Sequence, residues 1–350
     1  MGLAATVAAV GEVDPEVALE RRSRLVGLKL RALVRDHLDD VSVGEAGGFA
    51  PGAALLHGEA AWVLLDDRPA ERLGAALVWA SRAGATSLDL IADTEADAGT
   101  LARRGPAFTM PITVWRADGR SLVPARATAL PVSQPAPAQH EAFRELIIAG
   151  GADPFVEHGV LFGEVRGLEV CRVVDDPYQH VVRLEVGVGA HDREAFQMMH
   201  GDVPTVESLA RIVQAVESHR DVGASPHPLN RLGAERLLRW RLEQSPELVG
   251  AIELFPAPPP SPRPNLKDPI PCVATGVDQA GRVLRVVCAV GVDLDLIPFA
   301  VDARLAADAA DPGRVGTERL VVVTPSRDRL PVIDQLAGLL REAVVLVSVD

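Results

Sequence analysis

Short apolar runs bounded by turn residues recur along the first third of the chain, and they predict alternating strands and helices. Ala60 to Leu65 (AAWVLL) and Ser87 to Ala92 (SLDLIA) are typical of buried strands, since each is short, apolar and flanked by polar turn residues. Pro15 to His37 has helical spacing of its apolar residues and acids near its start, where the helix dipole favours them. The other elements expected here are helices at 69–83 and 95–104 and a strand at 112–115.

The rest of the chain shows the same alternation with two hairpin signals. Strands at 168–174 and 181–188 are joined through Asp175-Asp176-Pro177, and strands at 272–277 and 283–290 are joined through Asp278 to Gly281. The other elements expected here are helices at 192–201, from Thr205, at 228–242, 298–307 and 328–340, and strands at 249–254, 319–324 and 344–349.

Two proline-rich stretches divide this pattern. Residues 124–137 (PARATALPVSQPAP) lack an apolar period and predict a linker between an N-terminal domain, 1–123, and a C-terminal domain, 138–350. Residues 256–271 predict an extended, polyproline-like connection inside the second domain, because strand-like segments lie on both sides. The expected class is mixed α/β, with two domains of mixed sheets flanked by helices, and the length of 350 residues agrees with two domains.

Both domains can be described as a helix, three strand-like segments, a helix and a strand. This order resembles the restriction-endonuclease-like core. Members of that family carry an acidic residue on the second core strand and an acid-x-Lys pair on the third. The corresponding third strands here, AAWVLL and VLRVVCAV, have neither the acid nor the lysine. The resemblance therefore implies a nuclease-like core without its metal-dependent chemistry.

Charge and cysteine content limit the partners and the cellular compartment that we expect. The net charge of −13 argues against nonspecific wrapping of nucleic acid, which needs a positive field. The three cysteines, Cys171, Cys272 and Cys288, have no CxxC spacing, so we expect free thiols in a reducing cytoplasm. No apolar run reaches the roughly 18 residues of a membrane span, and the apolar N-terminus lacks the basic start of a signal peptide. We expect a cytoplasmic protein without a membrane partner.

Asp293 and Asp295 (GVDLDL) are the sharpest candidate for a metal site. If the preceding strand continues through them, both carboxylates project to one face and can hold Mg²⁺ or Mn²⁺. The alternative is a solvated strand end whose neighbouring apolar residues are buried.

A second candidate is the set of imidazoles and carboxylates at 185–202, which can bind zinc or manganese. Its spacing matches no ligand template, and several members have structural roles available, such as a helix cap at Asp192. The set comprises Glu185, His191, Asp192, His200 and Asp202. A weaker candidate for phosphate is the strand-to-helix turn at 324–328, where Arg327 and helix amides can meet an anion.

Two basic helices are the third signal, because stripes of arginine can contact phosphate and an adjacent aromatic can stack on a base. The alternative is that these arginines form ordinary helical ion pairs or dock onto acidic neighbours. The candidate residues are Arg21, Arg24, Arg31 and Arg35 on the first helix, and Arg236, Arg239 and Arg241 around Trp240 on a later one.

No complete catalytic template is present: GxSxG, GxxxxGK[ST], GxGxxG and HExxH are all absent. We therefore expect a non-catalytic cytoplasmic protein that binds or assembles with a protein partner or with itself, without a resident cofactor. The alternative is a metal-dependent enzyme acting on nucleic acid or nucleotide phosphates, with Asp293 and Asp295 as metal ligands and the arginine helices holding the substrate.

Overall fold

The computed structural model divides the chain into two compact units, residues 1–128 and 129–350. It describes residues 15–176, 180–200, 206–221, 224, 227–263, 268–311, 313 and 318–350, without the side chains of 15–19, 196, 197, 199 and 200. The division lies inside the stretch 124–137 that the sequence marks as a linker. Among the helices so described, none has the length and apolar character needed to cross a membrane.

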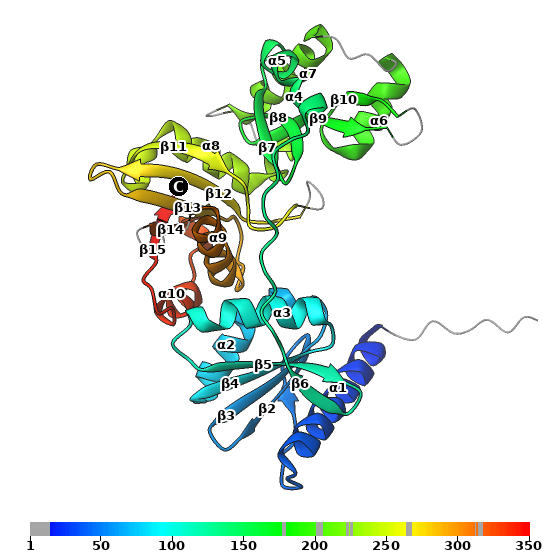
Figure 1. The fold of residues 1–350 in the computed structure, drawn as a ribbon, viewed down its shortest axis with the longest axis vertical. Coiled ribbons are helices and arrows are strands. Elements are labelled where there is room, and N and C mark those ends of the chain that lie inside the picture. The colour runs from blue at the N-terminus through cyan, green and yellow to red at the C-terminus, as the bar shows by residue number, and fades with distance from the viewer. Residues whose placement is uncertain are drawn as a thin grey trace, which may run out of the picture. The chain divides into compact units, whose positions relative to one another are not determined.

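Unit 1 is built on a six-stranded mixed sheet in the order β1-β2-β3-β4-β5-β6 (Figure 1). β3, β4 and β5 run parallel to one another, while β1–β2, β2–β3 and β5–β6 are antiparallel pairs. The elements are α1 (Pro15–Leu38), β1 (Gly47–Gly48), β2 (Gly52–His57), β3 (Ala60–Leu65), η1 (Pro69–Glu71), α2 (Leu73–Arg82), β4 (Ser87–Ala92), α3 (Glu95–Arg104), η2 (Gly105–Ala107), β5 (Ile112–Asp118) and β6 (Ser121–Pro124).

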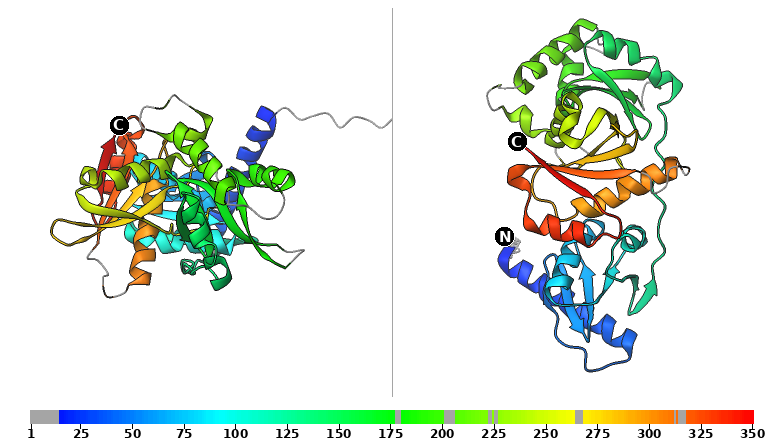
Figure 2. Two further views of the ribbon diagram at one scale, coloured as in Figure 1. Left: turned by 90° about the horizontal axis from the view of Figure 1, so that it is seen from above. Right: turned by 90° about the vertical axis from the view of Figure 1, so that its left-hand side faces the viewer.

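Helices cover both faces of this sheet (Figure 2). α1 buries Leu30, Leu33 and Val34 against alternate residues of β2 and β3, among them Trp62. α2 and α3 follow the crossovers between the parallel strands and cover the opposite face. Because side chains alternate between the faces of a strand, the uninterrupted apolar run of β3 supplies buried side chains to both faces of the sheet.

Unit 2 begins with a four-stranded antiparallel sheet in the order β10-β9-β8-β7. One face of this sheet is apolar and packs against α5 and α7, with Leu161, Val165 and Leu209 in the shared core. The elements are α4 (Ala138–Glu141), α5 (Arg144–Ala149), β7 (Asp153–Glu157), β8 (Val160–Val165), β9 (Leu168–Asp175), β10 (Val182–Val186), α6 (Gly189–His200) and α7 (Val206–Arg220).

A five-stranded mixed sheet, β11-β12-β13-β14-β15, completes unit 2. β11, β12 and β13 form an antiparallel meander, and β13, β14 and β15 are parallel. The elements are η3 (Pro228–Arg231), α8 (Ala234–Gln244), η4 (Pro246–Val249), β11 (Ala251–Ala257), β12 (Cys272–Asp278), β13 (Val283–Cys288), α9 (Leu296–Ala310), β14 (Arg319–Pro325), η6 (Ser326–Asp328), α10 (Pro331–Gly338) and β15 (Val345–Val349).

The expected mixed α/β class is confirmed, with sheets flanked by helices in both units. The β1–β5 part of the first sheet and the whole β11–β15 sheet share one plan: a helix, an antiparallel meander of three strands, and two parallel strands reached by helical crossovers. The third strands of this plan are β3 and β13, neither of which carries an acid-x-Lys pair.

Several predicted boundaries differ from the structure for local reasons. The helix expected at 228–242 is divided, because Gly233 takes a left-handed conformation with φ of 56° between η3 and α8. β11 continues through Pro256 to Ala257, which an edge strand tolerates because a proline nitrogen can face away from the sheet. The prediction missed β7 and β8, whose runs contain buried glutamates.

The cysteines lie where the two hairpin signals placed them. Cys272 and Cys288 are direct neighbours across the β12–β13 pair, and both are buried, as is Cys171. Burial raises the pKa of Cys171 to about 12, while the hydrogen bond with Cys272 and burial raise the pKa of Cys288.

All three thiols should therefore be unreactive in the native protein, because each is buried where a reagent cannot reach it. A chromogenic disulfide reagent should titrate three thiols only after denaturation without reductant. A count of one thiol under those conditions would reveal a disulfide and contradict the expectation.

Candidate functional site

A groove in unit 1 runs between α1 and the segment that leads into β1. Its volume is about 770 Å³. One wall is a stripe of α1 and the other is formed by residues 45–48 with Ala53 of β2. The lining residues are Glu20, Arg21, Ser23, Arg24, Gly27, Leu28, Arg31, Glu45, Ala46, Gly47, Gly48 and Ala53.

Three of the four arginines that the sequence singled out on this helix line the groove. Arg21, Arg24 and Arg31 are exposed, and Arg31 donates a hydrogen bond from Nε to the Val43 carbonyl at 3.2 Å. Within the described part of the chain, Arg21 and Arg24 have no hydrogen-bond or ion-pair partner. Arg35 lies on the same helix outside the groove and contacts Asp36 at 3.2 Å. The groove thus holds two guanidinium groups that are free to accept an anionic ligand.

Ion pairs to the ends of two parallel strands fix the rotation of α1. Arg22 pairs with Asp66 through two hydrogen bonds of 2.7 and 2.9 Å, and Lys29 pairs with Asp93 at 2.6 Å. These two acids directly follow β3 and β4. Together with the buried leucines of α1, these pairs orient the remaining arginines toward the groove.

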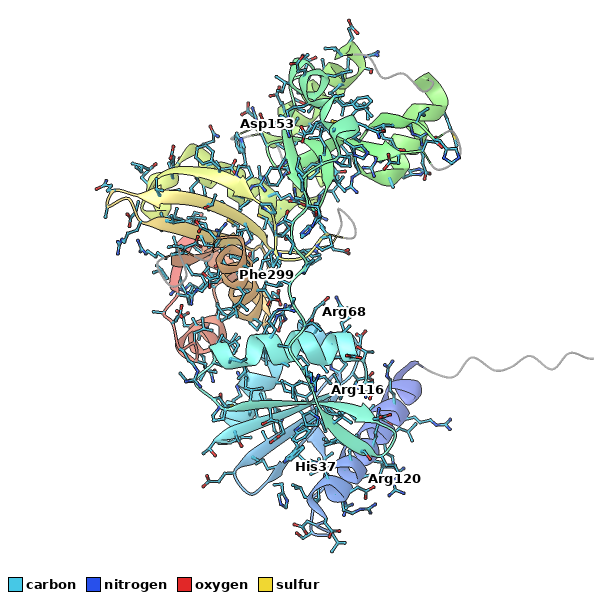
Figure 3. The ribbon with its side chains drawn as sticks, viewed as in Figure 1. His37, Arg68, Arg116, Arg120, Asp153 and Phe299 are labelled. Carbon is cyan, nitrogen blue, oxygen red and sulfur yellow. The ribbon has the colours of Figure 1, made fainter. Side chains whose placement is uncertain are left out.

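Aromatic contacts hold the C-terminal end of α1 in the same way. His37, labelled in Figure 3, lies 4.5 Å from the ring centre of Trp115 and 5.7 Å from that of Trp62. Trp115 donates a hydrogen bond to Asp89 at 2.9 Å, and burial raises the pKa of that carboxyl. The middle and the C-terminal end of the helix are therefore anchored, which gives the groove a fixed wall.

Exposed apolar side chains continue the arginine stripe of α1. Leu28 lines the groove and is 55% exposed, and Leu25, one turn from Arg21, is 57% exposed. Large apolar residues on a surface beside unpaired arginines are typical of protein-binding sites. The groove is thus both basic and apolar.

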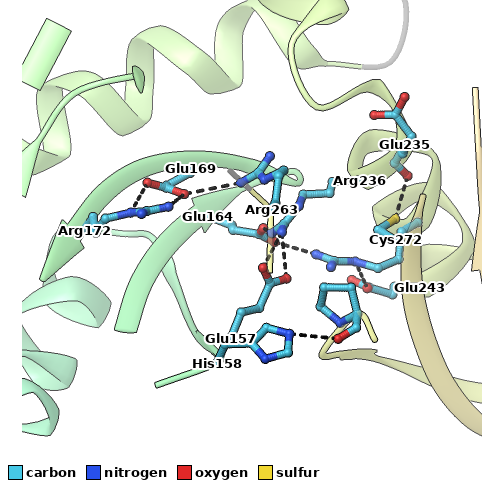
Figure 4. Close-up of polar contacts among 12 residues, drawn as sticks. Glu157, His158, Glu164, Glu169, Arg172, Glu235, Arg236, Glu243, Arg263 and Cys272 are labelled. Carbon is cyan, nitrogen blue, oxygen red and sulfur yellow. Dashed lines mark hydrogen bonds and ion pairs between the residues drawn. The ribbon is translucent and has the colours of Figure 1, made fainter. Parts of the chain in front are cut away.

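The arginines of α8 have a different environment, a buried ion cluster against β7 and β8 (Figure 4). Arg236 donates to Glu164 and, from Nη2, to both carboxylate oxygens of Glu157 at 2.6 Å. Arg239 donates to Glu164, and its Nε lies 2.9 Å from Glu243 Oε1. Since Arg236 is 3% exposed and Arg239 is 1% exposed, neither reaches a surface that nucleic acid contacts. The sequence hypothesis of docking onto acidic neighbours describes these two arginines.

Burial and charge act in opposite directions on the acids of this cluster. Burial alone would raise the pKa of Glu164, but Arg239 and Arg236 lower it to about 2. For Glu243, burial outweighs Arg239 and raises the pKa to about 7. The ion pairs of this cluster join α8 to the antiparallel sheet.

A second set of charges continues the cluster on the same sheet. The buried Glu169 accepts from Arg172 at 2.8 Å and from Arg263 at 3.3 Å (Figure 4). It also accepts from Arg193 at 3.2 Å. Arg263 belongs to the proline-rich connection between β11 and β12, so this contact ties that connection to the sheet. Arg241, the third predicted arginine of α8, is exposed and lies outside both sets of contacts.

Asp293 and Asp295 do not share a strand face, because β13 ends at Cys288. They lie in the turn before α9, where Asp293 Oδ1 accepts a hydrogen bond from the Asp295 amide at 2.8 Å. This local bond is an Asx-type turn that leads into the helix. The condition on which the metal hypothesis depended, continuation of the strand, is therefore not met.

The candidates at 185–202 are not brought together as a site by the described structure. Glu185 accepts from Arg183 at 2.9 Å and from Arg193 at 3.2 Å. His191 and Asp192 are in the first turns of α6, whereas the side chain of His200 and all of Asp202 lie outside the described residues. Over the described ranges, no group of three or more metal-ligating side chains comes together.

The turn at 324–328 is also held by local contacts. Asp328 accepts a hydrogen bond from the Gly291 amide at 2.8 Å, which joins the loops after β13 and β14. Arg327 is exposed and lies 3.7 Å from the same carboxylate. The carboxylate of Asp328 thus serves the structure of these loops and lies beside the one arginine of the turn.

The sequence predicted the arginines of the groove but not its second wall. In the sequence, residues 44–52 show only a glycine-rich composition. The signal available was the position of that segment directly after a helix rich in arginine.

In comparisons with known proteins, this chain matches no family model, no curated protein and no solved structure.

Proposed function

We propose that this protein is a non-catalytic binding protein whose α1 groove holds an acidic segment of a partner protein. The observation that carries the proposal is the pair of exposed arginines, Arg21 and Arg24, which have no partner in the described structure and line a groove of about 770 Å³. Carboxylates of a ligand would satisfy both guanidinium groups through charge-assisted hydrogen bonds.

The composition of the groove favours a protein ligand over nucleic acid. Leu28 and Ala46 give it apolar surface, which suits peptide side chains. Glu20 and Glu45 also line it, and they would repel a continuous row of phosphates while leaving room for separate carboxylates. The overall charge of −13 acts in the same direction.

Binding without catalysis agrees with the chemistry of the lining residues. Of the described residues that line the groove, none is a histidine or a cysteine. Ser23 is the single hydroxyl, and without a neighbouring imidazole it lacks the base that activates a serine nucleophile.

Reversing the charge of both free arginines should remove the binding. We expect a phage-displayed library of random short peptides to yield an acidic consensus on the full chain. The affinity for a consensus peptide should fall about tenfold or more in the R21E/R24E double variant, because attraction becomes repulsion. Fluorescence anisotropy with the labelled peptide measures the change.

The matched control is R82E/R126E, which reverses two exposed arginines of unit 1 that lie outside the groove. This variant should bind the consensus peptide as the wild type does. An enriched consensus without acidic residues would contradict the proposal, and so would equal loss in both variants. Salt-sensitive binding of a single-stranded oligonucleotide that competes with the peptide would assign the groove to nucleic acid instead.

A further inference from the structure

One wall of the α1 groove is the free edge of a β-sheet. β1 is the terminal strand of the sheet and, among the residues that the structure describes, pairs with β2 alone, through Gly47 with Ala54 and Gly48 with Ala53. An edge strand presents unpaired backbone amides and carbonyls to any chain that lies alongside it. Gly47 and Gly48 line the groove, so this edge adjoins the ligand space.

The described residues of unit 1 give no conformational or packing reason for the glycines of this wall. Neither Gly47 nor Gly48 has a positive φ, the conformation that favours glycine. A Cβ on Gly48 would meet nothing within 4 Å, and one on Gly47 would make an ordinary contact of 3.8 Å with the Ala54 carbonyl. Glycine in a strand costs conformational entropy, and it often marks a place where another backbone approaches closely.

The opposite wall supplies arginine side chains that can recognise an extended ligand. Arg21 and Arg24 are three residues apart on α1, a rise of about 4.5 Å. An extended chain places alternate side chains on one face about 6.7 Å apart. Because arginine side chains are long, an acid-x-acid segment lying along β1 brings its carboxylates within reach of the helix, and the intervening residues face away.

From these observations we propose that the groove binds its acidic ligand as an added β-strand on the outer edge of β1, with α1 recognising alternate carboxylates. The inference rests on the proposed function and specifies its binding mode. Backbone pairing along an exposed edge combined with side-chain recognition is a recurring mode of peptide binding.

The test uses the full chain and a synthetic peptide in which Glu alternates with Val. An analogue N-methylated at every internal residue keeps all side chains and charges but has no internal amide donors. Strand addition predicts that the analogue binds about tenfold or more weakly. It also predicts that the unmodified peptide slows amide hydrogen exchange in the segment that contains Gly47 and Gly48, because one row of backbone groups becomes paired.

Two variants test whether the peptide binds along β1. Gly47→Val/Gly48→Val adds side chains to the wall and should weaken binding about tenfold, with thermal stability equal or higher because β-branched residues favour strands. Gly44→Val is the matched control, since its Cβ also meets nothing within 4 Å and it does not line the groove. Equal loss in the two variants would overturn the location.

The outcomes separate this inference from the proposed function. If the methylated analogue binds as well as its parent and exchange at the glycines is unchanged, strand addition is wrong, although loss in R21E/R24E would still support acidic-peptide binding. If no acidic peptide binds at all, the proposed function is wrong and this inference is wrong with it.

Discussion

Replacing Arg236 with methionine should lower the free energy of unfolding of unit 2 by about 3–5 kcal/mol, the usual cost of breaking a buried ion cluster by removing one partner. Arg236 is 3% exposed and neutralises both Glu157 and Glu164. Methionine has similar length and fills the same space, so the loss arises from two carboxylates left buried with fewer partners. Urea denaturation followed by circular dichroism measures the change, and hydrogen exchange shows whether β7, β8 and α8 lose protection.

Arg241→Met is the matched control, since it makes the same replacement on the same helix at an exposed position. Its free energy of unfolding should change by less than about 0.5 kcal/mol, as for most surface substitutions. A triple variant that also replaces Glu157 and Glu164 with leucine should recover only part of the loss, because the buried Arg239 then loses Glu164 and keeps Glu243 as its one acidic partner among the described residues. Equal stability of Arg236→Met and Arg241→Met would show that the cluster does not stabilise the fold.

Strands whose signal is local could be predicted from the sequence. β3 and β4 have the predicted bounds because each is a short apolar run between turn residues, which determines length and burial together. The β12–β13 hairpin follows from Asp278 to Gly281, where Asp278 accepts hydrogen bonds from the amides of Ala280 and Arg282 at 2.9 Å. Such signals are contained within a few residues and need no knowledge of the partner strand.

Features that depend on distant residues could not be predicted in this way. Glu164 interrupts an apolar run, so β8 has no clear strand pattern. Its partner Arg236 lies 72 residues further along the chain. Nothing in the sequence around Glu164 or Arg236 indicates that the two residues pair. The arginines of α8 therefore could not be distinguished by sequence pattern from those of α1. What separates the two helices is tertiary: α8 meets buried acids, whereas Arg21 and Arg24 line an open groove.

The two mixed sheets share one plan, so the residues that follow corresponding strands can be compared. In both, the strand that starts the parallel part is followed by two acids before a helix: Asp66 and Asp67 after β3, and Asp293 and Asp295 after β13. In unit 1, Asp66 pairs with Arg22 of α1. In the second sheet, Asp293 caps the turn into α9 through the Asp295 amide. Acids after the corresponding strands therefore serve structure in both sheets, through a long-range ion pair in the first and a local turn in the second.

Raising the pH from about 5 to 8 should destabilise unit 2, and Glu243→Gln should remove this effect. Burial raises the pKa of Glu243 to about 7, above the ordinary value of 4.5 that it regains on unfolding. Between these values the folded state binds more protons than the unfolded state, so the free energy of unfolding falls as pH rises and levels off above about 7. The full loss is about 3 kcal/mol, at 1.36 kcal/mol per pKa unit.

Glu164 has the opposite dependence in a separate pH range. Its pKa of about 2 in the folded state is below the ordinary value, so its contribution is present above pH 4.5 and is lost as pH falls toward 2. These two groups together place the stability maximum near pH 5. At pH 8 the Glu243→Gln variant should exceed the wild type by up to about 3 kcal/mol, whereas at pH 5 the two should differ little. Melting temperatures measured across this range test the prediction, with Glu247→Gln as an exposed control in the following turn. If Glu243→Gln keeps the wild-type decline between pH 5 and 8, Glu243 is not the group that titrates there, and its carboxylate is ionised in the folded protein beside Arg239.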